Sequence, residues 1–71
     1  MKTTAVFCTG PEADIDRFGE EIPVWQVWDG DNDGEATGWS MTAYTLIDAQ
    51  DAARRRAEQL HLPLEMDASP A

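Results

Sequence analysis

The chain has 71 residues, with 14 acidic and 5 basic side chains and a formal net charge of −9 at pH 7. This length accommodates a single domain, residues 1–71, and the charge excludes the basic surface that direct binding to nucleic acid or to an anionic membrane requires. Cys8 is the only cysteine, which excludes an internal disulfide and favours a reducing, cytoplasmic location. No apolar run is long enough to cross a bilayer, and the N-terminal residues are too polar for a signal peptide.

The first part of the sequence predicts a strand followed by a short helix. Residues 3–9 are mainly apolar or threonine, which is typical of a strand, and Gly10 and Pro11 interrupt them. Proline suits the first turn of a helix, and the acidic residues that follow it are favourable near a helix N-terminus. These features predict a short helix over residues 11–18, ended by Gly19.

The remainder predicts two more strands, a long helix and a final short strand. Residues 22–28 form an apolar run with a proline near its beginning, and residues 39–47 alternate between apolar and polar side chains. Residues 48–60 combine an N-cap aspartate with an alanine-rich face that suits close packing on a sheet. A short strand over residues 62–66 and a flexible tail over residues 67–71 complete the prediction.

This order is β-α-β-β-α, with or without a final strand, and it predicts an α+β fold. We expect a small sheet of three or four mainly antiparallel strands, with the helices on one face. With the fourth strand, the arrangement resembles a reduced split β-α-β unit. That resemblance concerns the fold and implies no function.

The three tryptophans divide between the two faces of the predicted sheet. Trp25 and Trp39 share the inner face, toward the helices, by the alternation of their strands. Trp28 then points to the outer side, together with Val24, and Tyr44 lies on that same side. Because helices on one face leave the other face open, we expect Val24, Trp28 and Tyr44 to form an exposed apolar strip that contacts a partner.

An acidic loop between the second and third predicted strands contains Asp29, Asp31 and Asp33, followed by Gly34. This spacing matches the beginning of a calcium-binding EF-hand loop, in which alternating carboxylates and a glycine turn supply the ligands. The bidentate glutamate expected at the end of such a loop is absent, because Ser40 stands there. Two interpretations are open: a weak calcium or magnesium site formed by the three aspartates, and an acidic, solvated hairpin loop.

No group of residues indicates catalysis or a bound cofactor. His61 is the only histidine, and its spacing from Cys8 gives no reason to expect a catalytic dyad. One thiol and one imidazole are also too few for a structural zinc site. Arg54, Arg55 and Arg56 are spread around the predicted helix and form no basic stripe. We expect surface ion pairs of Arg55 with Asp51 and of Arg54 with Glu58, and an Arg56 guanidinium directed to solvent. We therefore expect a protein that is not an enzyme and has no cofactor.

The composition favours a protein-binding module whose partner has a basic surface. The expected contact residues are those of the apolar strip and of the acidic loop: Val24, Trp28, Tyr44, Asp31, Asp33 and Glu35. A dense carboxylate surface can occupy a groove built for nucleic acid, because it presents negative charge as phosphates do.

In size and charge alone, the chain resembles the small anti-CRISPR and anti-restriction inhibitors that phages and plasmids carry against host nucleases. That resemblance implies an inhibitor that acts as a DNA mimic. The alternatives are a weak cation-binding loop protein and a soluble domain whose acidity serves solubility alone. Self-association as a homodimer is left open.

Overall fold

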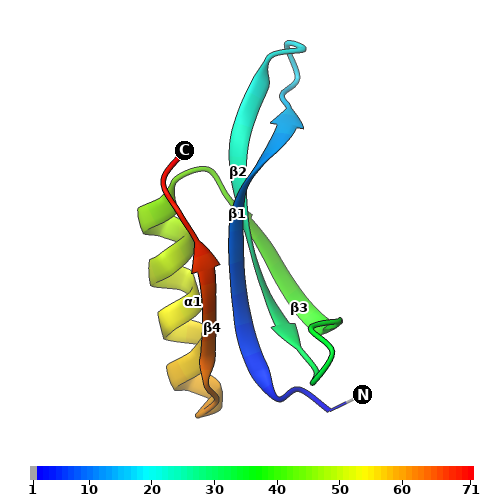
Figure 1. Cartoon of the computed structure of the whole chain (residues 1–71), viewed down its shortest axis with the longest axis vertical. Coiled ribbons are helices and arrows are strands. Elements are labelled where there is room, and N and C mark those ends of the chain that lie inside the picture. Colours follow the sequence, from blue (N-terminus) through cyan, green and yellow to red (C-terminus); the bar gives the residue numbers. More distant parts are fainter. Residues whose placement is uncertain (1) are drawn as a thin grey trace.

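The structure of the chain is a computed structural model that describes residues 2–71. Its elements follow in the order β1 (Ala5–Ile15), β2 (Glu21–Gly30), β3 (Ala36–Ala43), α1 (Leu46–Leu60) and β4 (Leu64–Ala68). The strands form one four-stranded sheet in the order β3-β2-β1-β4, and α1 covers one of its faces (Figure 1). The α+β class is therefore confirmed.

Two details of the predicted fold are wrong. The sheet is mixed, because β1 pairs antiparallel with β2 but parallel with β4. Residues 2–71 also contain one helix where two were expected. The two edge strands, β3 and β4, run in the same direction and are joined by α1, while β1 and β2 lie between them. This connection is the split β-α-β unit that a fourth strand implied.

The predicted helix over residues 11–18 is instead the outer half of a β-hairpin. Ala13 pairs with Pro23 and Ile15 pairs with Glu21, so this part of β1 continues the ladder with β2. A helix of eight residues is marginal in water unless an apolar face packs against the protein. The strand pairing extends a ladder that β1 and β2 already form within the sheet, so the arm needs no separate nucleation, and the helical signals after the proline do not prevail.

The first hairpin turns at Asp16, whose side chain organises the chain around it. Its Oδ1 accepts hydrogen bonds from the backbone N–H groups of Phe18 and Glu20, at 2.8 and 2.9 Å. The backbone N–H of Asp16 donates to the Glu20 carbonyl oxygen at 2.9 Å, which closes the loop. Gly19 adopts a φ of 79°, a left-handed conformation that glycine takes without strain.

The second hairpin repeats this turn with the same sequence pattern, Asp-x-x-Gly-Glu, over residues 31–35. Asp31 Oδ1 accepts from the backbone N–H groups of Asp33 and Glu35, at 2.9 and 3.1 Å. Gly34 has a φ of 81°, close to that of its counterpart in the first turn. Both turns thus use an aspartate to replace backbone partners that the reversing chain lacks.

The core lies between α1 and the covered face of the sheet. Three alanines of α1, Ala49, Ala53 and Ala57, are buried there, as their spacing predicts. Their small side chains let the helix approach the sheet closely. The other buried members of this cluster come from the three longest strands: Val6, Cys8, Trp25, Val27 and Ala43.

Helix α1 begins two residues earlier than predicted, because Thr45 and not Asp48 is its N-cap. The Thr45 hydroxyl accepts a hydrogen bond from the Asp48 backbone N–H at 3.1 Å. Leu46 and Ile47, which the alternating pattern assigned to a strand, therefore belong to the helix. Within residues 2–71, no helix has the length and apolar character that crossing a membrane demands.

The C-terminal segment takes part in the fold beyond the predicted boundary. Asp67 lies within β4, and the Ser69 backbone N–H donates to the Gly10 carbonyl oxygen at 3.0 Å. The Ser69 carbonyl oxygen in turn accepts a hydrogen bond from Trp25 Nε1 at 3.0 Å. The segment expected to be a tail from residue 67 onward thus contributes a strand pairing and a contact to a buried tryptophan.

Candidate functional site

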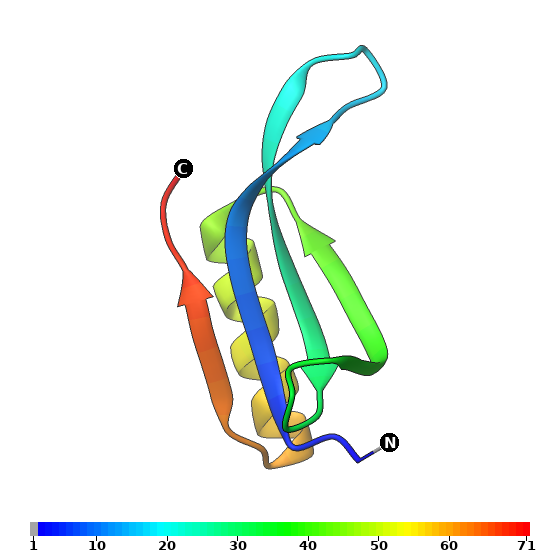
Figure 2. The same cartoon turned by 45° about the vertical axis from the view of Figure 1, so that its right-hand side comes forward.

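The β1–β2 hairpin extends beyond the rest of the sheet as a two-stranded arm, residues 12–23. Strand β4 pairs with β1 only as far as Gly10, and β3 pairs with β2 only from Trp25 onward. Past these points β1 and β2 pair only with each other, and Figures 1 and 2 show them projecting away from the helix and the other strands. The arm accounts for much of the elongated shape, whose longest extent is 37 Å.

A β-bulge sets the arm at an angle to the sheet. Thr9 pairs with Gln26 and Glu12 pairs with Val24, so β1 has one more residue than β2 between these two pairs. A bulge bends the strand and increases its twist. The bend is visible in Figure 2, where the arm leans away from the direction of β3.

The arm ends in two large apolar side chains that the fold leaves in water. Phe18 is 75% exposed and Ile15 is 61% exposed. The guanidinium carbon of Arg17 lies 5.0 Å from the centre of the Phe18 ring, in a cation–π arrangement. The turn itself uses only the backbone of Phe18, so the fold does not need the aromatic ring.

The arm is also strongly acidic. It contains five of the 14 acidic residues and a single basic one, Arg17. The five carboxylates flank the two apolar side chains: Glu12, Asp14, Asp16, Glu20 and Glu21. The arm therefore combines apolar anchors with a surrounding negative potential.

The apolar strip predicted from the strand alternation is not continuous. Val24 is only 1% exposed, so its inclusion in an exposed strip is wrong. Trp28 does lie on the uncovered face, where it pairs with Ser40 of β3, but Tyr44 lies past the end of that strand. Tyr44 is 66% exposed and stands apart from Trp28.

Trp28 is held by the protein itself and is half-buried. Its ring stacks on Phe7 with the ring centroids 5.5 Å apart and the planes 12° from parallel. Its Nε1 donates to the Gly34 carbonyl oxygen at 2.9 Å, which ties the second turn to the uncovered face. The prediction that Trp25 is buried and Trp28 lies partly exposed on the opposite face is confirmed, while Trp39 is only partly buried against the core.

The three aspartates of the acidic loop have different roles in the structure. Asp29 belongs to β2 and is 5% exposed, with its carboxylate bound by Arg56. Asp31 uses Oδ1 to hold the turn, and Asp33 is exposed. In residues 2–71, no set of three or more acidic, histidine or cysteine side chains is arranged to hold a metal ion. The predicted site of Asp29, Asp31 and Asp33 is therefore not assembled.

Arg56 turns inward, contrary to the expectation that its guanidinium points to solvent. Its Nε and Nη2 donate to the two oxygens of Asp29 at 3.0 and 2.7 Å, and its guanidinium lies 4.9 Å from the Trp39 ring centre. The hydrogen bond to Asp29 raises the pKa of Arg56 above its ordinary value. The expected surface pair of Arg55 with Asp51 is present at 3.2 Å.

The thiol of Cys8 lies in the core. Cys8 has no exposed surface, and burial raises the pKa of its thiol. A buried thiol with a raised pKa forms little of the thiolate that acts as a nucleophile or metal ligand. Its environment is that of a small apolar side chain packed in a strand.

Sequence reasoning missed Ile15 and Phe18, because both lie in the segment, residues 11–18, that it predicted to be a helix. The signal that identifies the hairpin is the Asp-x-x-Gly-Glu pattern, which occurs at residues 16–20 and again at residues 31–35. The acidic loop that was expected to bind the partner lies at the end of the molecule opposite the arm (Figure 1). Comparisons with protein-family models, with curated proteins and with solved structures found no match to this chain.

Proposed function

We propose that the chain is a small, non-enzymatic protein-binding module whose interface is the arm. The observation that carries this proposal is the exposure of Phe18, at 75%, on the tip of a protruding hairpin. Removing a side chain of this size from water is worth about 1.5–3 kcal/mol. The isolated chain does not realise that gain, whereas a partner with an apolar pocket would do so.

The charge of the arm favours a partner with a basic surface. Five carboxylates against one arginine give this segment a strong negative potential. A surface that binds nucleic acid has the complementary potential, because it receives phosphate charges. An inhibitor that blocks such a surface is the concrete form of this proposal, in line with the size and charge of the chain.

The apolar and charged residues of the arm would serve different steps of binding. Charge steers the two proteins together and sets the association rate, an effect that salt screens beyond about 8 Å. Buried aromatic side chains supply most of the energy at interface hot spots and set the dissociation rate. Phe18 is the expected anchor, and Asp14 and Glu20 are the expected steering residues.

Affinity capture with matched variants tests the proposal. The parent, Phe18→Ser and Tyr44→Ser are immobilised and exposed to a lysate of the source cells, and bound proteins are identified by mass spectrometry. Tyr44 is the matched control, because it is an aromatic residue of similar exposure, 66%, outside the arm. A partner of the arm is retained by the parent and by Tyr44→Ser and is lost with Phe18→Ser.

Binding of the purified partner then separates the two contributions. Phe18→Ser should speed dissociation, at a cost of about 2 kcal/mol for a hot spot. The pair Asp14→Asn and Glu20→Gln should slow association and weaken its dependence on salt. Nucleic acid should compete for the partner's surface. The proposal fails when no captured protein depends on Phe18, or when the neutralised arm associates with its partner as fast as the parent at low salt.

A further inference from the structure

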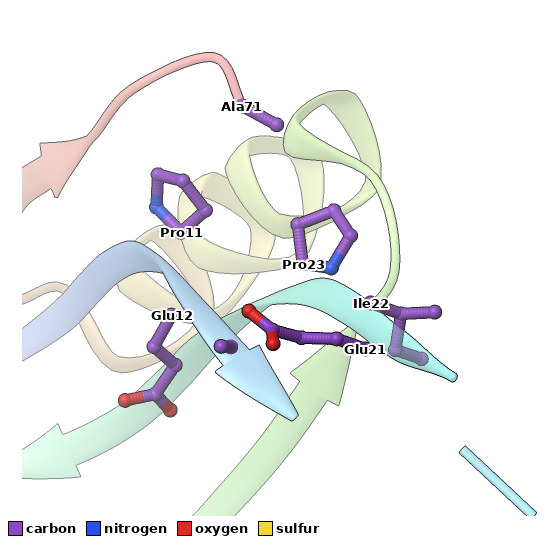
Figure 3. A pocket seen from close by; sticks show the side chains of 7 residues that line it. Pro11, Glu12, Glu21, Ile22, Pro23 and Ala71 are labelled. Atoms are coloured by element: carbon purple, nitrogen blue, oxygen red, sulfur yellow. The ribbon is translucent and has the colours of Figure 1, made fainter. Parts of the chain in front are cut away.

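A cavity of about 400 Å³ lies where the base of the arm meets the C-terminal segment (Figure 3). The cavity is open to solvent, because most of its lining residues are exposed. The lining comes from the two strands at the base of the arm and from the C-terminal segment: Pro11, Glu12, Ala13, Glu21, Ile22, Pro23 and Ala71. A volume of this size is sufficient for one long side chain together with part of its backbone.

The register of the hairpin gathers the apolar wall on one side of the arm. Ala13 lies directly opposite Pro23, and the next pair on that same face is Ile15 with Glu21. Figure 3 shows the Glu21 side chain extending from β2 toward β1, in the region between Glu12 and Pro23. The cavity thus has prolines and an alanine along its length and a carboxylate beside them.

We propose that this cavity receives an arginine or lysine side chain of the partner. The proposal rests on the function proposed above and names the partner group that the arm recognises. Both side chains have an apolar stem and a cationic head, and they bury the stem against apolar surface while the head stays with water or an anion. Pro11 and Pro23 would contact the stem, and Glu21 would pair with the head.

The surrounding charge selects this occupant over others. An anionic group meets Glu12, Glu21 and the other carboxylates of the arm, so it is repelled. A neutral apolar side chain contacts the prolines but removes water from Glu21 without replacing it by a counter-charge. A cationic side chain satisfies both parts of the cavity.

A peptide titration followed by NMR tests the proposal on the full chain. The probes are acetyl-Gly-Arg-Gly-amide, the same peptide with lysine, and the same peptide with citrulline, which keeps the shape of arginine without its charge. We expect saturable shifts of the backbone amides of Ala13, Glu21 and Ile22 with the two cationic peptides. Citrulline should bind about fivefold more weakly, as for the loss of a partly solvated ion pair.

Two variants separate the cavity from the general acidity of the chain. Glu21→Gln should lower the affinity for the arginine peptide about fivefold. Glu35→Gln makes the same charge change in the distant second turn and should leave that affinity unaltered. Ala13→Leu adds an apolar side chain to the cavity at unchanged charge and should abolish the saturable shifts. Ala13 is exposed in the isolated chain, so the larger side chain is compatible with the fold.

The outcomes distinguish this inference from the proposed function. Absence of saturable shifts, equal binding of citrulline and arginine, or equal weakening by Glu21→Gln and Glu35→Gln would each overturn the cavity proposal. When the captured partner depends on Phe18 but not on Glu21 or Ala13, the arm binds the partner and the cavity does not. When the arginine peptide binds as expected but no partner depends on Phe18, the cavity stands and the interface at the tip of the arm is wrong.

Discussion

Asp29 and Arg56 join β2 to α1 through a bidentate ion pair at the margin of the core, with N–O distances of 2.7 and 3.0 Å. The Asp29 side chain is 7% exposed and the Arg56 side chain is 24% exposed. A buried carboxylate is costly unless it is paired and hydrogen-bonded, and Arg56 supplies both. The pair therefore ties the helix to the sheet and removes Asp29 from the acidic surface.

Removing one member of this pair should strongly destabilise the fold. We expect Asp29→Asn to lower the free energy of unfolding by about 3 kcal/mol, the lower end for a broken buried pair, because Arg56 keeps some contact with water. The exposed pair of Arg55 with Asp51 is the control, and Arg55→Ala should cost about 0.5 kcal/mol or less. Urea denaturation measures both values, and equal costs for the two substitutions would contradict a special role for Asp29.

Any side chain at Gly19, the left-handed glycine of the first turn, should lower the stability of the fold. We expect Gly19→Ala to destabilise the protein by about 1 kcal/mol, because a Cβ disfavours this conformation even where space is free. Nothing lies within 4 Å of a Cβ built on Gly19 or on Gly38, and only Gly19 has a positive φ. Gly38→Ala is thus the matched control and should leave the stability unchanged or slightly raised. Similar denaturation midpoints for the two variants would refute the conformational explanation.

Cys8 should make the stability fall at alkaline pH. Burial raises the pKa of its thiol in the folded state. The contribution of the thiol to the free energy of unfolding is therefore complete below the unfolded-state pKa of about 8.5. Above that pH the unfolded thiol ionises first, and the contribution is lost as the pH rises through the folded pKa. We expect the parent to lose up to about 1.4 kcal/mol per pH unit more than Cys8→Ala in this range. Denaturation curves from about pH 8 to about pH 10 test this, and parallel profiles would be the contrary result.

Calcium should not stabilise the chain through its acidic loop. Asp29 is engaged by Arg56, and Asp31 Oδ1 accepts two backbone hydrogen bonds within the turn. Thermal unfolding with and without about 1 mM calcium, a concentration at which even weak protein sites begin to fill, should give the same midpoint. A midpoint that rises with calcium in the parent but not in Asp33→Asn would restore the loop as a cation site.

The tertiary structure decided the features of the arm and of the acidic loop. Residues 11–18 carry helix-initiating signals, yet the chain here pairs with β2 across a turn. Because this segment forms a hairpin and not a helix, Phe18 is exposed at its tip. Asp29 has the spacing of a metal ligand, but its partner, Arg56, is 27 residues away along the chain. Neither outcome is encoded by neighbouring residues, because both depend on which distant groups come together when the sheet and the helix pack.

The sequence by itself determined the parts that follow from local periodicity. The alternation along β2 placed Trp25 and Trp28 on opposite faces, because successive side chains of a strand point to opposite sides. The spacing of Ala49, Ala53 and Ala57 placed three small side chains on one face of α1, because residues four apart lie near each other on a helix. Such patterns are set by backbone geometry within a few residues. Strand pairing and ion pairing between distant segments are set only when the whole chain packs.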